Sequence, residues 1–442
     1  MRRRFPKLFA ALSSAFILSN LSVGTAHAIE LVPTVEDAIL HNPEFREQVK
    51  AHQGVQADLR GAEGGWLPKI DLGAGIGQEK ITTKTADTDL TRKEAAVTVS
   101  QNLFEGFATQ SEITRQQARL DSAGYSAQAK ANEIALSMVE AYVNLLKEQE
   151  LLRLAQQSHE THQRILDQII QRNQAGVGNS VEVDQAKARL SLASSNLIAE
   201  RNNYRDTLAR FERVLGRMPD SDLVKPTFSY KFPEKLEDAV NTALIEHPAM
   251  RSANADIATV RYQYDVAESA FYPRVDVDVK QTWDENINGI EGKSENFQAM
   301  LRVSYNLFNG GKDDANLDKV AASVHQAAEV RNTTRRQIIE NMHYAWNAEK
   351  YIRDQLEFMQ KHKDLTLATL QGYRKQFSLG RRSLLDLLNT EDEYISAQRA
   401  LVSSQHDHLI AEYRILNGMG LLLNALNIKV DYALAENDYK EE

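Results

Sequence analysis

The sequence predicts a mainly α-helical fold that carries four β-strands per chain and an internal two-fold repeat. Three observations predict it. Short motifs recur about 204 residues apart, two segments in each copy alternate apolar and polar residues, and most of the remaining chain follows a helical period.

The composition excludes several classes of protein. The 442-residue chain has no cysteine, which excludes disulfides, thiolate catalysis, zinc–cysteine sites and iron–sulfur clusters. A formal net charge of −9 argues against nucleic acid as a partner. The mean hydropathy of −0.46 excludes a polytopic helical membrane protein. It is compatible with the half-apolar strands of a membrane β-barrel.

Residues 1–28 are typical of a signal peptide. A basic start precedes an apolar stretch over about residues 8–23, and Ala26-His27-Ala28 has the small-residue pattern of a cleavage site. Cleavage there starts the mature chain at Ile29. Loss of four basic residues then lowers the formal charge from −9 to −13. No cysteine follows the site, so we expect no lipid anchor.

The duplication covers nearly the whole mature chain. We expect a first repeat over 29–217, an equatorial linker over 218–235, a second repeat over 236–423 and an equatorial tail over 424–442. The recurring motifs are Val35-Glu36-Asp37-Ala38 with Leu236-Glu237-Asp238-Ala239, Trp66-Leu67-Pro68 with Phe271-Tyr272-Pro273, and Asn102-Leu103-Phe104-Glu105-Gly106 with Asn306-Leu307-Phe308-Asn309-Gly310. At this point two tandem independent domains remain an alternative.

Each repeat contains a segment of period two, which predicts one β-hairpin over about 67–104 and another over about 273–308. We expect their loops over about 79–92 and 284–295. The run Gly73-Ala74-Gly75-Ile76-Gly77 lacks the helix start that a phosphate loop needs, so we interpret it as small residues on one face of a strand.

The rest of each repeat predicts helices. One helix precedes each hairpin, over about 35–63 and 236–270. A long helix follows, over about 106–175 and 313–378, and a return helix comes after it, over about 181–215 and 384–423. At 1.5 Å per residue each long helix is a rod of about 100 Å, beside which two shorter helices fit end to end.

The strand pattern predicts an assembly. The apolar face of each hairpin has no cover within the chain, and in an exported protein outer-membrane lipid can cover it. Four strands cannot close, and open strand edges are not tolerated in lipid. Three copies give twelve strands with room for a passage. We therefore expect a homotrimer whose twelve-stranded outer-membrane β-barrel continues into a long periplasmic α-helical barrel.

The order, spacing and duplication of these motifs resemble the TolC family of outer-membrane channel proteins over about residues 30–425. The resemblance implies a trimeric duct in the outer membrane with a large periplasmic portion. It also implies a periplasmic membrane-fusion adaptor and an inner-membrane transporter as partners. The tips of the helical hairpins, where the family contacts its adaptor, correspond to Gly176, Val177, Gly380 and Arg381.

The resemblance also implies a gate beside those tips. Asp386 matches an acidic residue that forms a ring of three in the closed pore, and Asn389 replaces a second acid. Arg382 and Glu182 match the basic and acidic partners of a latch. Phe377 stands where the family often has tyrosine, so one latch hydrogen bond is expected to be missing.

The segments 381–391 and 309–313 look like the type I secretion branch of the family, which exports large adhesins. We therefore expect an exit duct for protein substrates, fed by an ABC-type transporter. Efflux of small molecules is the alternative, and a periplasmic coiled-coil scaffold is a remote one.

We expect no enzymatic activity, no cofactor and no metal. The sequence has no nucleophile elbow and no His-Glu-x-x-His motif. The densest histidine groups are His159 with His162 and His406 with His408, and neither brings a convincing third ligand.

Overall fold

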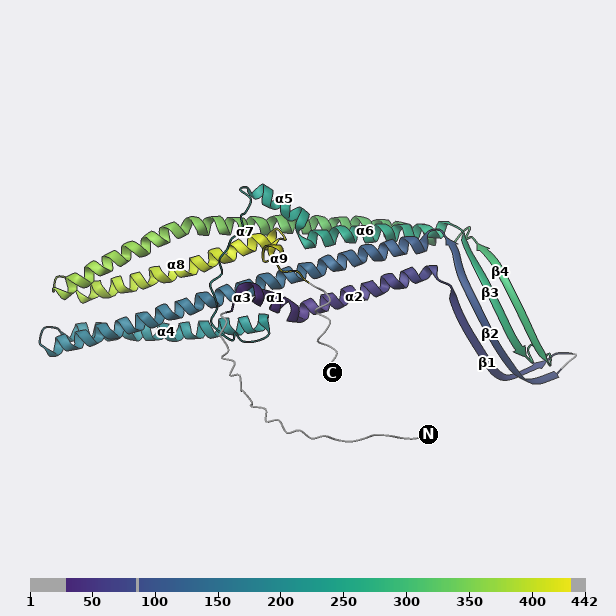
Figure 1. Cartoon of the computed structure of the whole chain (residues 1–442), viewed down its shortest axis with the longest axis horizontal. Coiled ribbons are helices and arrows are strands. Elements are labelled where there is room, and N and C mark those ends of the chain that lie inside the picture. Colours follow the sequence, from purple (N-terminus) through teal and green to yellow (C-terminus); the bar gives the residue numbers. More distant parts are fainter. Residues whose placement is uncertain (1–28, 85–86, 431–442) are drawn as a thin grey trace, which may run out of the picture.

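The computed structural model describes residues 29–84 and 87–430. The expected signal peptide and most of the expected tail lie outside these residues. Figure 1 shows an elongated molecule, in which a sheet stands at one end of a long helical body and two helical hairpins form the other end. In the described part, no helix has the length and apolar character needed to cross a bilayer.

The two repeats contain the same elements in the same order. The first has α1 (Leu31–His41), α2 (Pro43–Glu63), β1 (Lys69–Thr82), β2 (Asp87–Glu105), α3 (Ala108–Gln174) and α4 (Ser180–Leu215). The second has α5 (Leu236–Glu246), α6 (Pro248–Glu268), β3 (Arg274–Glu285), β4 (Lys293–Ser304), α7 (Lys312–Ser378), α8 (Leu384–Gly418) and the short α9 (Leu422–Ala425). Single 3₁₀ turns, Gly64–Trp66 and Ser269–Phe271, precede β1 and β3. The predicted internal repeat is therefore confirmed.

The helix before each hairpin is two helices, where the sequence analysis expected one. The breaks fall at Asn42-Pro43 and His247-Pro248. Proline has no N–H to donate and disfavours helical geometry in the residue before it. Asn42 instead caps α2 by accepting a hydrogen bond from the Glu44 N–H at 2.9 Å. The second return helix also ends early, at Gly418, where a turn leads to α9.

The strands pair in the order β1-β2-β3-β4, all antiparallel. Because β2 and β3 belong to different repeats, both repeats share one sheet, and the alternative of two independent domains is wrong. The first hairpin is longer than expected. Its strands extend through most of the predicted loop over 79–92, where Lys80 lies opposite Asp89. The second ends at Ser304 instead of 308.

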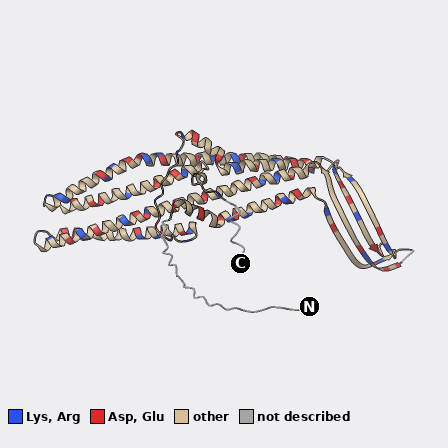
Figure 2. Ribbon diagram, viewed as in Figure 1, with Lys and Arg blue, Asp and Glu red and all other residues tan. Residues whose placement is uncertain are grey.

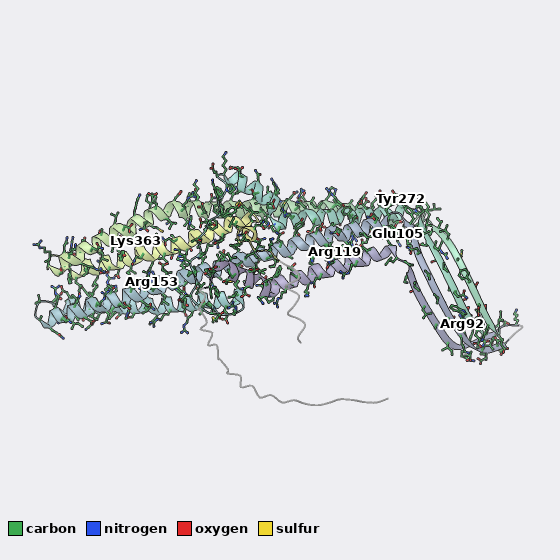
Figure 3. All side chains as sticks on the ribbon, viewed as in Figure 1. Arg92, Glu105, Arg119, Arg153, Tyr272 and Lys363 are labelled. Carbon is green, nitrogen blue, oxygen red and sulfur yellow. The ribbon has the colours of Figure 1, made fainter. Side chains whose placement is uncertain are left out.

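The recurring Asn-Leu-Phe-x-Gly motif lies where the sheet meets the helices, close to Glu105 and Tyr272 in Figure 3. Gly106 has φ +64°, and a Cβ there would lie 2.6 Å from the Cβ of Tyr272. Only glycine fits this position without displacing its neighbours. Phe107 then contacts the Tyr272 ring edge-on, with centroids 6.3 Å apart. The chain can therefore leave the sheet and start α3 within two residues.

The largest hydrophobic core surrounds the middle of the long helices, where α1, α5 and α9 gather in Figure 1. Tyr142 of α3 is fully buried there. Its hydroxyl oxygen lies 2.7 Å from the carbonyl oxygens of Ile29 and Val224, so its one proton is shared between them. Burial raises the pKa of Tyr142 to about 12. This hydroxyl fastens the start of the first repeat and the linker to α3.

We predict that Tyr142→Phe lowers the free energy of unfolding by about 1–2 kcal/mol, because the Val224 carbonyl loses the hydrogen bond donated by a fully buried side chain. Thermal unfolding followed by circular dichroism measures the change. The control is Tyr230→Phe, a partly exposed tyrosine of the linker. Equal midpoints for the two variants would contradict a structural role for the Tyr142 hydroxyl.

Candidate functional site

The end of the molecule farthest from the sheet consists of two hairpin tips, α3–α4 and α7–α8 (Figure 1). Both turns use the same backbone geometry. Gly176 has φ +76° and Gly380 has φ +70°, a region that glycine enters at little cost. The N–H of the next residue then donates back to the helix, from Val177 to Arg172 at 3.0 Å and from Arg381 to Gln376 at 2.9 Å.

The return helices also begin alike. Asn179 accepts a hydrogen bond from the Glu182 N–H at 2.9 Å, and Ser383 accepts one from the Asp386 N–H at 3.1 Å. The caps place Glu182 and Asp386 in the first turn of α4 and α8, where the helix dipole favours a carboxylate. The two tips therefore present matching acidic positions.

Arg382 lies against its own hairpin. Its guanidinium carbon is 4.1 Å from the centre of the Tyr373 ring, and its Nε donates to Gln376 at 3.1 Å. Its nearest carboxylate is that of Asp386, at 3.7 Å. Among the ion pairs of the described residues none joins Arg382 to Glu182. The expected latch pair is thus not formed within one chain.

Phe377 joins the two hairpins through its ring. The guanidinium carbon of Arg172, on α3, lies 4.9 Å from the ring centre. The ring also packs on an apolar cluster drawn from both hairpins, formed by Ile165, Leu166, Ile169, Ala186, Leu384 and Leu388. A cation–π contact and apolar packing therefore act where the resemblance implies a tyrosine hydrogen bond.

A partly buried polar cluster, which the sequence analysis did not predict, lies about two to three helical turns from the tips. Arg189 of α4 contacts Asp392 of α8 at 2.6 Å and donates to the Asn389 side chain at 2.7 Å. His162 of α3, only 3% exposed, lies 3.2 Å from Asp392. We call these four residues the hairpin cluster. It links α3 and α4 to α8 within one chain.

The hairpin cluster changes the interpretation of two predicted residues. Asn389, expected only as a missing acid of the pore ring, accepts a hydrogen bond from the other hairpin. His162, one of the histidines considered as a metal ligand, is buried and lines a groove together with Arg189 and Asp392. The spacing of Asn389 and Asp392 places both on one face of α8. Nothing in the sequence indicates that Arg189 lies opposite them.

Two further carboxylates are buried nearby. Glu391 is 4% exposed and accepts two hydrogen bonds from Arg374, at 2.7 and 2.8 Å, within the α7–α8 hairpin. Glu200 of α4 pairs with Arg399 of α8. Burial, and then the charge of Glu200, raise the pKa of Glu148 on α3. Charged contacts between the hairpins thus continue beyond the hairpin cluster, on the side away from the tips.

The sheet separates apolar from charged residues. Paired residues of antiparallel strands point to one face, so Val99 opposite Val279 shares an apolar face with Val97 and Val277. The other face carries Asp276 and Asp278, which pair with Arg274 at 2.8 Å and Arg302 at 3.4 Å. Along the helices acidic and basic residues are interspersed (Figure 2).

The described residues contain no group of three or more His, Asp or Glu side chains placed to hold a metal ion. His406 is 2% exposed, and its Nδ1 lies 2.8 Å from the Val402 carbonyl oxygen. His408 lies 3.4 Å from Glu349 and 3.8 Å from Glu412. These histidines contribute to helix packing.

The family model described as "Outer membrane efflux protein" matches residues 34–217 and 239–421, one match per repeat. Outer membrane protein TolC of Escherichia coli is 20% identical over 458 residues, covering 99% of this chain and 91% of TolC. Alkaline protease secretion protein AprF of Pseudomonas aeruginosa is 22% identical over 439 residues, covering 96% and 89%.

The crystal structure of the Campylobacter jejuni CmeC outer membrane channel superposes with a TM-score of 0.78 at 16% identity. It covers 89% of this chain and 86% of CmeC. The fold is therefore that of passive outer-membrane channels, with an outer-membrane sheet and a large helical portion in the periplasm. The chain belongs to the outer membrane efflux protein family. The resemblance noted in the sequence is confirmed.

Proposed function

We propose that the protein forms a homotrimeric, passive exit duct of a tripartite export system and has no catalytic activity of its own. The observation that carries the proposal is a four-stranded sheet, with β1 and β4 as its edges, set on helices 67 residues long. Three such sheets close a barrel of twelve strands. The helices below them extend the duct by about 100 Å. The alternative of a soluble coiled-coil scaffold does not explain the presence of this sheet.

The partners follow from the two ends of the duct. Lipid covers the apolar face of the sheet in the outer membrane. A periplasmic membrane-fusion adaptor docks at the tips formed by Gly176, Val177, Gly380 and Arg381, which lie at the far end of the helices. An inner-membrane transporter, most simply of the ABC type, supplies the energy.

For cargo we propose a large secreted protein, such as an adhesin or an RTX-type protein. The resemblance of segments 381–391 and 309–313 to the secretion branch supports this. So does the likeness to AprF, whose name assigns it to protease secretion. Small-molecule efflux is the second candidate, because the family description itself names efflux.

The gate we propose lies at the tips. Three copies of Asp386 around the axis form an acidic ring that attracts cations. In each chain, Arg382 of the same hairpin holds the Asp386 carboxylate in place. The hairpin cluster and the Arg172–Phe377 contact hold α7–α8 against α3–α4. Glu182, the acidic latch partner that the resemblance implies for Arg382, belongs to the same proposed gate. Docking of the adaptor then releases α7–α8 from α3–α4 and widens the pore.

We predict that Asp392→Asn raises single-channel conductance in planar bilayers, because Arg189 and His162 lose their shared anion. The matched control is Asp184→Asn, an exposed aspartate near the tip of α4 whose lysine partner is on its own helix. Both variants should run as trimers on native gels. Unchanged conductance of an intact Asp392→Asn trimer would exclude the hairpin cluster from the gate.

We predict that Asp386→Ala weakens block of the channel by multivalent cations, measured as the concentration that halves the current. A shift of about tenfold corresponds to about 1.4 kcal/mol of lost cation binding. Glu182→Ala serves as the comparison at the matching position of the other tip. Equal block in wild type and Asp386→Ala would place the cation site elsewhere.

Deletion of the gene tests the function, with two readouts taken from the same strain. Loss of one large surface or secreted protein at unchanged sensitivity to dyes, detergents and antibiotics is the expected result. Broad sensitisation with an intact set of secreted proteins would identify an efflux duct. Finding the protein soluble in the periplasm would contradict a channel of either kind.

A further inference from the structure

A polar groove lies beside the hairpin cluster, between α3, α4 and α8. It has a volume of about 330 Å³, and three members of the hairpin cluster line it: His162, Arg189 and Asp392. Glu200 of α4 and Arg399 of α8 line it as well. The groove therefore lies on the seam where α8 of one hairpin meets α3 and α4 of the other. In the proposed gate this is the seam that must part.

His162 has one nitrogen in contact with a carboxylate and one without a partner. Its Nε2 lies 3.2 Å from Asp392, whereas its Nδ1 is buried and has no hydrogen-bond partner in the described part of the chain. A neutral imidazole carries one proton, and here Nε2 uses it to donate to the carboxylate. Nδ1 then keeps a free lone pair. A second proton can therefore bind at Nδ1 without breaking the contact with Asp392.

The charges that face His162 cancel while its imidazole is neutral. Arg189 and Glu200 come from α4, and Asp392 and Arg399 come from α8. They form two ion pairs, Arg189 with Asp392 at 2.6 Å and Arg399 with Glu200. The other residues of α3 that line the groove carry no charge. A proton on His162 thus adds one positive charge, for which Asp392, 3.2 Å away across the seam, supplies the counter-charge.

We propose that His162 is a pH sensor of the gate. On acidification it becomes an imidazolium, pairs with Asp392 and holds α3 against α8, so that the duct stays shut. The proposal rests on the gate proposed above. Histidine is the side chain whose ordinary pKa lies between about pH 5 and pH 8. Parting a buried ion pair leaves each charge without a partner, so the charged form opposes opening more strongly than the neutral form does. Opening is therefore coupled to release of the proton.

Only one of the two repeats contains this sensor. Counting 204 residues along the chain, His162 corresponds to Thr366 and Asp392 to Ala188. Neither of these side chains carries a charge. Thr366 instead donates its hydroxyl proton to the His362 carbonyl of its own helix, at 2.8 Å. The seam between α3 and α8 can therefore respond to pH, whereas the corresponding positions of the other repeat cannot.

The test measures the open fraction of single channels in planar bilayers between about pH 7.5 and about pH 5.5, where imidazoles titrate. We expect the open fraction of the wild type to fall several-fold on acidification. His162→Gln, which stays neutral, should remove this fall. Asp392→Asn should remove it too, because the charged imidazole then has no carboxylate to pair with.

The matched control is His159→Gln. His159 is half-buried, lies three residues earlier on α3 and forms no ion pair with another described residue. This variant should keep the response of the wild type. All of these proteins retain Asp386, so titration of the acidic ring is common to them.

A response that is lost in His162→Gln and Asp392→Asn trimers but kept in His159→Gln trimers supports the sensor. A response that persists in His162→Gln trimers, or is absent from the wild type, overturns the sensor and leaves the proposed duct standing. If His162→Gln forms no trimers on native gels, Asp392→Asn decides by the same criterion. Wild-type trimers that conduct at neither pH would overturn the proposed function itself.

Discussion

The pairing of β2 with β3 is the interaction on which the rest of this structure depends. It joins strands from the two repeats, from Lys93 opposite Glu285 to Glu105 opposite Arg274, with one shift of register between Asn102 and Phe104. Without it each repeat would have only a two-stranded hairpin, which is marginal by itself. With it, α3 and α7 leave the same sheet in the same direction, and α6 and α8 pack between them. The tips of both repeats therefore lie at one end, where they can act together.

Much of this arrangement could be predicted from the sequence, because the determinants are local. Period-two alternation near Val275 and Val279 predicts strands, and long proline-free stretches predict helices. Residues whose role depends on partners far along the chain could not be predicted. Arg189, His162 and Asp392 are ordinary polar residues until the fold places α3, α4 and α8 around one point. Pro43 and Pro248 do mark the helix breaks in the sequence. The helical periodicity on both sides of each proline nevertheless favoured the prediction of a single helix.

The polar contacts between the hairpins suggest where the proposed duct moves. Parting a seam held by Arg189, Asp392, Glu200 and Arg399 exposes charges that water can solvate again, so the net free-energy change is small. Parting an apolar seam exposes hydrocarbon at about 25 cal/mol per Å². We therefore expect movement inside each chain, between the hairpins that these polar contacts join.

The same reasoning bears on selectivity. On the polar face of the sheet, Arg274 neutralises Asp276 and Arg302 neutralises Asp278. Charges paired at this distance leave a weak field a few ångströms away, and salt screens what remains. We therefore expect a barrel with this face turned inward to discriminate little between cargoes by charge. In the proposed assembly the acidic ring of Asp386 lies at the tip. If the duct works as proposed, the partners that load it choose the cargo, and this chain contributes closure.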